Sequence, residues 1–135
     1  MSIVYAEITL RNEWDVGNAE RGLIKEDEVR QVTVQSIVDT GAWTIAINEE
    51  TREKLGLSDK GYGKATLADG KEELYPMAGP LEVRWKNRSH VCNALVLPGA
   101  KDILLGAIPL EGMDLTVNPQ RELVGVHGDI VMHRI

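Results

Sequence analysis

The chain has 135 residues, of which 43% are hydrophobic and 27% are charged, and its formal net charge is −6. This length suits a single domain with one core, residues 1–135, and the composition is that of a soluble globular protein rather than a disordered one. The negative charge disfavours nucleic acid as a partner, because phosphate binding needs a concentrated basic patch. No apolar run reaches the length of a membrane-spanning helix, so we expect no membrane association either.

The sequence also bears on the compartment in which the protein works. Its N-terminal stretch contains Glu7 and has no basic region before a short apolar run, which argues against a secretory signal. The lone Cys92 cannot form an internal disulfide, and this agrees with a reducing compartment. We therefore expect a cytoplasmic protein.

Strand patterns dominate the first part of the chain. Residues 2–10 and 28–39 contain period-two stretches rich in Val, Ile and Thr, which is typical of half-buried strands. The segment between them, residues 17–28, is charged and glycine-punctuated and is predicted to be a turn or loop. After Asp39 comes a short predicted helix that Asn48 caps, that begins with acidic residues and that Gly56 ends.

Two hairpins are predicted in the middle of the chain. In residues 64–76, Asp69 and Gly70 lie between two strand-like runs, which indicates a hairpin with a two-residue turn. In the second hairpin, residues 81–85 and 89–99 are the strands, and Lys86, Asn87 and Arg88 join them.

The last third adds short elements. Residues 102–106 are predicted to be a buried strand, residues 107–113 to form about two turns of helix, and residues 113–118 and 122–126 to be strands. The predicted fold class is all-β, most simply a closed β-barrel with one or two short helices.

Three motifs follow one another in a characteristic order. VDTGA (residues 38–42) comes first, then the hairpin tipped by Asp69-Gly70, then ILLG (residues 103–106) about sixty positions after the first motif, with a short helix behind it. Together they resemble the retropepsins, the single-domain aspartic proteases of the retroviral type, from about Val32 to Pro119. The sequence is more similar to cellular and bacterial members than to viral ones, because its hairpin tip reads ADG. The resemblance implies a closed barrel of the retropepsin type.

The resemblance also implies a reaction, the hydrolysis of peptide bonds by an aspartic endopeptidase. Such an enzyme activates water between two carboxylates, one ionised and one protonated, and this pair titrates in two separated steps. The chain contains one DTG motif. The second carboxylate is therefore expected from Asp39 of a second copy, in a twofold homodimer that cleaves a peptide or protein substrate. No metal ion and no organic cofactor is implied.

Residue roles carry over from the resemblance position by position. Asp39 is the implied catalytic residue, Thr40 would hydrogen-bond across the twofold axis, and Gly41 would let substrate backbone approach. The implied substrate-binding residues are Ala42, Trp43, Leu67, Ala68, Asp69 and Gly70. Trp43 departs from the family pattern, in which Asp, Ser or Thr commonly follows DTGA, and its indole would narrow the cleft or form an apolar wall.

Other interpretations stay open. Asp39 can be an ordinary turn residue at a strand end, and the Asp69-Gly70 hairpin can be a solvated turn rather than a lid. The chain can also be a retropepsin-fold module that binds peptides with little or no cleavage, or a monomeric barrel that binds a ligand. A zinc site at His90 and Cys92 is disfavoured because no second pair with ligand spacing exists, and Cys92 lacks the sequence surroundings of a protease nucleophile.

Overall fold

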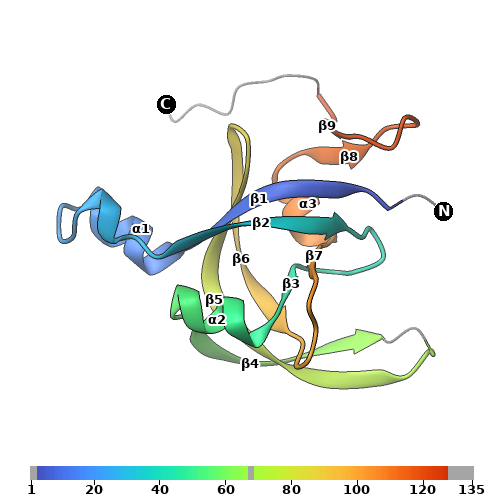
Figure 1. The fold of residues 1–135 in the computed structure, drawn as a ribbon, viewed down its shortest axis with the longest axis horizontal. Helices are drawn as coiled ribbons and strands as arrows, with labels where there is room; N and C mark the ends of the chain where they lie inside the picture. The colour runs from blue at the N-terminus through green and yellow to red at the C-terminus, as the bar shows by residue number, and fades with distance from the viewer. Residues whose placement is uncertain (1–2, 67–68, 128–135) are drawn as a thin grey trace.

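A computed structural model describes residues 3–66 and 69–127 of the chain (Figure 1). The elements in chain order are β1 (Tyr5–Asn12), α1 (Glu13–Glu20), the 3₁₀ turn η1 (Glu26–Glu28), β2 (Gln31–Val38), β3 (Ala46–Ile47), α2 (Glu49–Leu55), β4 (Ser58–Thr66), β5 (Glu72–Trp85), β6 (Arg88–Val96), β7 (Ile103–Leu105), α3 (Ala107–Gly112), β8 (Leu115–Val117) and β9 (Leu123–Gly125). Within the described residues, none of the helices has the length and apolar character needed to cross a membrane.

The main sheet closes on itself. Its strand order is β1-β2-β7-β3-β6-β5-β4, and β1 also pairs with β5. The strands β1, β2, β7, β3, β6 and β5 therefore form a closed barrel. Strand β4 pairs with β5 outside the closed ring, and β8 and β9 form a separate two-stranded sheet (Figure 1). The prediction of an all-β protein with a closed barrel and short helices is confirmed.

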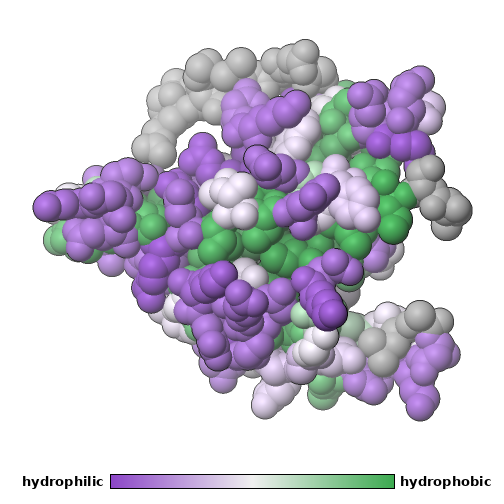
Figure 2. Space-filling model, in the orientation of Figure 1, coloured by the Kyte–Doolittle hydropathy of each residue, from purple (hydrophilic) through white to green (hydrophobic). Residues whose placement is uncertain are grey.

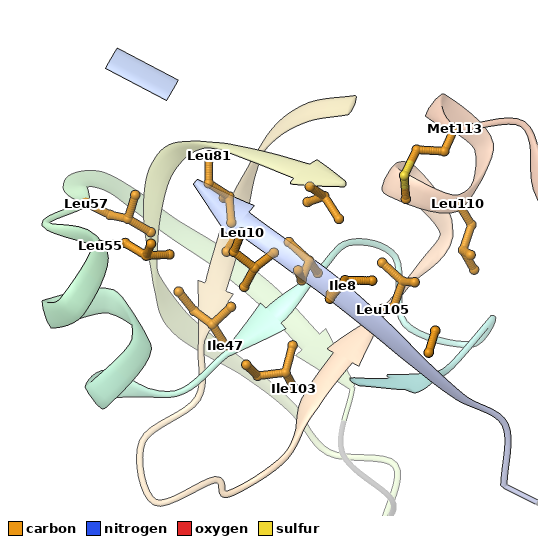
Figure 3. Packing of buried hydrophobic residues seen from close by; sticks show 14 of the residues in the cluster. Ile8, Leu10, Ile47, Leu55, Leu57, Leu81, Ile103, Leu105, Leu110 and Met113 are labelled. Carbon is orange, nitrogen blue, oxygen red and sulfur yellow. The ribbon is translucent and has the colours of Figure 1, made fainter. Parts of the chain in front are cut away.

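The barrel interior is a continuous apolar core. In β1, every second residue is buried, and this alternation directs Ile8 and Leu10 inward. Leu81 of β5 and Leu105 of β7 meet them in the same cluster (Figure 3). Burying each such side chain contributes roughly 1.5–3 kcal/mol, so this packing is the main term that holds the strands together. Helices α2 and α3 attach to the barrel through Leu55 of α2, Leu110 of α3 and Met113, the residue that follows α3 (Figure 3).

The prediction of a loop over residues 17–28 was wrong in its first part. Helix α1 covers Gly17 to Glu20, and η1 covers Glu26–Glu28. The side chain of Asn12 caps α1 by accepting a hydrogen bond from the backbone N–H of Asp15 at 3.0 Å. The carboxylate of Asp15 in turn accepts hydrogen bonds from the backbone and the guanidinium of Arg30.

The two predicted hairpins share one long strand. Strand β5 runs without a break from Glu72 to Trp85, with a register shift between Ala78 and Leu81, so its first half pairs with β4 and its second half with β1. The last described pair of the β4–β5 ladder is Thr66 and Glu72. Lys71 lies outside the strands, so β5 begins one residue later than a two-residue turn at Asp69 and Gly70 predicts.

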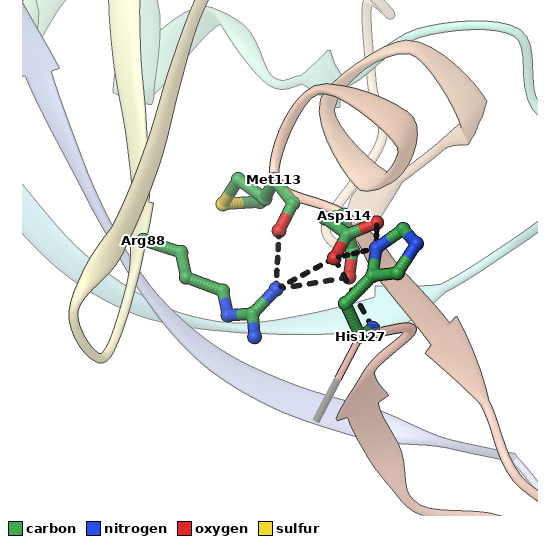
Figure 4. Close-up of polar contacts among 4 residues, drawn as sticks. All are labelled: Arg88, Met113, Asp114 and His127. Carbon is green, nitrogen blue, oxygen red and sulfur yellow. Dashed lines mark hydrogen bonds and ion pairs between the residues drawn. The ribbon is translucent and has the colours of Figure 1, made fainter. Parts of the chain in front are cut away.

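A buried arginine fixes the β8–β9 sheet on the barrel. Arg88 of β6 is 2% exposed and donates hydrogen bonds to the backbone carbonyls of Met113, at 2.9 Å, and Asp114, at 3.0 Å (Figure 4). The Asp114 carboxylate also lies 2.8 Å from Nδ1 of His127, and this hydrogen bond lowers the pKa of Asp114. The polar cluster thus joins the tip of the β5–β6 hairpin, the end of α3 and the chain after β9.

Candidate active site

Asp39 lies directly after β2, where the apolar strand ends. Strand β2 runs parallel to β7, with Val38 beside Leu105, and the backbone N–H of Asp39 donates to the carbonyl of Leu105 at 3.0 Å. The Asp39 backbone therefore continues the sheet hydrogen bonding by one residue, while its side chain is only half-buried. A carboxylate is thus held rigidly at the surface end of a buried strand.

The catalytic loop, which we define as residues 39–44, folds back on this carboxylate. The N–H of Gly41 donates to Oδ1 of Asp39 at 2.9 Å, and the N–H of Ala42 donates to the carbonyl of Asp39 at 3.1 Å. A Cβ on Gly41 would lie 3.2 Å from Oδ1, tighter than most such contacts, so a glycine suits this turn. Among the residues that the structure describes, none donates a hydrogen bond to Oδ2 of Asp39.

Helix α3 supports the catalytic loop from behind. The N–H groups of Ala107 and Ile108 donate to the carbonyls of Ala42 and Trp43 at 2.8 and 3.0 Å. A Cβ on Gly106 would overlap the carbonyl oxygens of Ala42 and Thr44. The glycine of ILLG therefore lets the two backbones meet, a role that the sequence motif alone does not show.

The two threonines of the catalytic loop have different surroundings. Thr44 is 1% exposed, and its hydroxyl donates to the carbonyl of Asn93 on β6 at 3.1 Å, so it anchors the loop to the barrel. Thr40 is exposed, and no described residue hydrogen-bonds its hydroxyl. The structure thus leaves Thr40 accessible at the surface beside Asp39.

Trp43 joins the catalytic loop to the β4–β5 hairpin. Its indole Nε1–H donates to the backbone carbonyl of Lys64 on β4 at 2.7 Å, while 42% of the residue stays exposed. The polar atom of this side chain therefore points to the protein's own backbone. Sequence reasoning identified Trp43 as unusual but did not identify Lys64 as its partner.

The predicted substrate-binding residues fall into two groups. Ala42 and Trp43 lie on the catalytic loop, next to Asp39, whereas Asp69 and Gly70 are exposed at the far end of the β4–β5 hairpin (Figure 1). At that end Asp69 Oδ1 accepts from the N–H of Lys71 at 3.0 Å and Gly70 has φ +85°. Leu67 and Ala68 lie outside the described residues. In the structure, only the first group lies beside the carboxylate.

A cavity of about 300 Å³ opens beside Asp39. Its lining is mostly apolar, and Asp39 is the single carboxylate among the described lining residues, which are Ile3, Val4, Ile37, Val38, Asp39, Thr40, Val117 and Arg121. Hydrophobic surface is visible on this side of the molecule, where β1 begins and β2 ends (Figure 2). A larger cavity, of about 800 Å³, lies between β1, the β5–β6 tip and the segment before β9, and its described lining includes no residue of the catalytic loop.

Cys92 and His90 do not form a competing site. Burial raises the pKa of the Cys92 thiol to about 11, so the thiol is protonated at neutral pH and is a poor nucleophile. The His90 ring packs against Gly112 at the end of α3. In the described ranges, no three or more His, Cys, Asp or Glu side chains come together as a metal site requires.

Comparison with known proteins agrees with this geometry. No curated protein sequence matches the chain. The family model described as aspartyl protease matches residues 26–108, which is more than half of the chain. The matched region includes β2, the catalytic loop, both hairpins and the start of α3. The chain therefore belongs to the aspartyl protease family, in its retropepsin-like form.

Proposed function

We propose that the protein is an aspartic endopeptidase whose active site forms between two copies of Asp39, one from each chain of a homodimer. The observation that carries the proposal is the setting of the Asp39 carboxylate. The backbone is fixed by β7, one oxygen accepts from Gly41, and no described residue hydrogen-bonds the other. A carboxylate with one oriented oxygen and one available oxygen is suited to hold a water molecule and exchange a proton with it.

The chemistry divides the work between the two carboxylates. The ionised Asp39 takes a proton from the water while the oxygen of that water attacks the carbonyl carbon of the peptide bond. The protonated Asp39 gives its proton to the carbonyl oxygen, which stabilises the tetrahedral intermediate. When the C–N bond breaks, the carboxyl that took the proton from water gives it to the leaving nitrogen, the other carboxylate takes a proton from a hydroxyl of the intermediate, and the pair again shares one proton.

The surface around Asp39 supports the homodimer. Ile3 and Ile37, with three valines, line the cavity beside the carboxylate, and Ile3 is 57% exposed. A twofold axis through this region would bury the same apolar patch on both chains and bring the two Asp39 side chains together. The exposed hydroxyl of Thr40 would then meet its own counterpart across the axis.

The test replaces Asp39 by asparagine. Asparagine keeps the size of the side chain and can still accept from Gly41, but it cannot act as an acid or base, so we expect cleavage to fall by at least about 10²-fold. Cleavage of an unfolded protein substrate would be followed between pH 3 and pH 9. The wild type should show a bell-shaped profile with its optimum below neutral pH, because one carboxyl must stay protonated and the unperturbed value for Asp is about 3.9.

The control is Asp27→Asn, which removes a carboxylate from an exposed position in η1. This variant should cleave like the wild type. Equal cleavage by the Asp39→Asn chain, or a rate that climbs through alkaline pH, would contradict the proposal. The second candidate function, peptide binding without cleavage, is favoured by the presence of Trp43 where the family has a polar residue. It predicts that wild type and Asp39→Asn bind an unfolded substrate without cleaving it.

A further inference from the structure

The indole of Trp43 makes a contact that links two parts of the candidate active site. Nε1 donates to the carbonyl of Lys64 at 2.7 Å. Lys64 pairs with Leu74 in the β4–β5 ladder, and β4 is the last strand of its sheet, so no strand of the described residues pairs with its other edge. An edge strand that is paired on one side only is free to move unless another group holds it. Trp43 supplies such a group from the catalytic loop.

Gly63, the residue before Lys64 in β4, leaves space for the indole ring of Trp43. A Cβ built on Gly63 would lie 3.1 Å from Cζ2 of Trp43, 2.8 Å from Sδ of Met77 and 3.0 Å from Cδ2 of Leu95. The ring therefore packs against bare backbone, beside side chains of β5 and β6. This packing gives a physical role to the second glycine of the Gly61-Tyr62-Gly63 segment.

The contact spans the two elements that would have to hold a substrate between them. Trp43 is four residues after Asp39, in a loop whose backbone α3 holds through Ile108. The hairpin of β4 and β5 projects from the barrel (Figure 1), and Lys64 lies two residues before the end of β4. The position of the hairpin relative to the catalytic loop thus depends on the contact between Trp43 and Lys64.

We propose that Trp43 is a positioning residue that clamps the β4–β5 hairpin to the catalytic loop at Lys64, near the end of β4, so that the hairpin is already placed when substrate binds. This inference rests on the proposed function for its kinetic consequence, but the clamp itself is a property of the free protein. In place of a polar side chain that contacts substrate, this chain uses an indole that fixes its own hairpin. A pre-placed hairpin lowers the ordering cost of binding, and therefore KM, without touching the reacting atoms.

The first measurement does not need activity. Trp43→Phe keeps an aromatic ring and removes the N–H donor, so we expect faster amide hydrogen exchange in residues 58–66 and 72–77, with no change in β1. Trp85→Phe, at the tip of the β5–β6 hairpin, is the matched control and should leave exchange in those segments unchanged. Unchanged exchange in the Trp43→Phe chain would overturn the clamp, whether or not the protein is a peptidase.

The second measurement uses the cleavage assay. A hydrogen bond worth about 0.5–1.5 kcal/mol converts to a rise in KM of roughly 2- to 10-fold in Trp43→Phe, with kcat within about twofold of the wild type. A fall in kcat at constant KM would overturn the positioning role. If exchange accelerates but no variant, including the wild type, cleaves peptide, the clamp stands and the proposed function fails.

A second variant covers the case in which Trp43→Phe does not fold. Gly63→Ala keeps the tryptophan side chain but puts a methyl group 3.1 Å from Cζ2 of its ring and closer still to Met77 and Leu95, so this crowding should displace the ring from β4. The expected result is the same acceleration of exchange in residues 58–66 and 72–77. A folded Gly63→Ala chain with wild-type exchange in both segments would overturn the clamp.

Discussion

Cys92 illustrates how far burial alone can decide the chemistry of a side chain. Cys92 is partly buried on β6, and its thiol lies next to the hydroxyl of Thr44. Burial disfavours the thiolate and raises its pKa to about 11, whereas an unfolded cysteine titrates near 8.5. The residue is therefore inert in the folded protein, although it is the one cysteine of the chain.

We expect native Cys92 to react with an aromatic disulfide reagent at pH 8 about 250-fold more slowly than the same residue in urea. The reason is the thiolate fraction, which at pH 8 is roughly a thousandth for a pKa near 11 and about a quarter for the unfolded value. The release of the coloured thiol would be followed with and without urea. Equal rates would show that the thiol is accessible and activated in the fold.

At the residue scale, the sequence predicted the candidate site but not the tertiary contacts that hold the catalytic loop in place. Asp39 and its turn were predictable because a charged residue and a glycine interrupt an apolar strand. The need for Gly106 was not, because the carbonyls that a Cβ would overlap belong to residues about sixty positions earlier. The partner of Trp43 lies 21 positions later, on an edge strand whose position depends on the closed barrel. Such contacts follow from topology, which local patterns do not encode.

At the scale of elements, α1 depends on polar contacts rather than on an apolar face. Asn12 is 1% exposed, caps the helix and also donates to the carbonyl of Leu55 at 2.8 Å. Asp15 pairs with Arg30 at 2.8 Å, which ties the helix to the start of β2. Local periodicity could not predict α1, because its stabilising partners lie outside the segment.

We expect Asp15→Asn to lower the free energy of unfolding by about 1–2 kcal/mol at pH 7. Hydrogen bonds from the Arg30 side chain, with a further one from its backbone, hold the pKa of Asp15 below its usual value. A carboxylate with a lowered folded pKa stabilises the fold above the unfolded pKa of about 3.9, and this contribution is lost as the pH falls through the folded value. The difference between wild type and variant should therefore be constant from pH 7 to about pH 5 and shrink below pH 4.

Urea unfolding at a fixed protein concentration, repeated at several pH values, would measure this difference. Asp102→Asn, an exposed carboxylate before β7, is the control and should change stability by less than about 0.5 kcal/mol. A penalty for Asp15→Asn that stayed constant down to pH 2 would show that packing, and not the ion pair, is what the substitution removes.

The elements themselves were largely predictable. Period-two patterns located β1, β2 and the strands of both hairpins, and the cap at Asn48 with Gly56 at φ +61° bounds α2 as predicted. What the patterns could not give was the continuity of β5, because Gly79 and Pro80 resemble a break. In the structure the strand continues through them, with a register shift, because β6 pairs with it on both sides of that point.

At the scale of the whole molecule, the proposed function makes one chain half of an active site. The catalytic loop presents a single carboxylate beside a mostly apolar cavity of about 300 Å³, at a surface that includes the exposed Ile3 and Thr40. A second copy related by a twofold axis would supply the missing carboxylate and cover the apolar surface in the same step. Assembly and catalysis would then depend on each other.

This dependence predicts how mixtures of chains behave. If each site needs two Asp39 carboxylates, then wild-type chains mixed with Asp39→Asn chains and allowed to exchange should lose activity as the square of the wild-type fraction, because every hybrid dimer holds one carboxylate. At equal amounts, about a quarter of the dimers would be active, whereas independent sites would leave half of the activity. Cleavage rate and sedimentation would be measured across mixing ratios. Asp27→Asn chains are the control, because mixing them with wild-type chains should not lower the cleavage activity at any ratio. Removal of the like-charge contact should also leave the Asp39→Asn dimer at least as stable as the wild type. A strictly linear fall in activity, with sedimentation showing that hybrids form, would rule out the shared site.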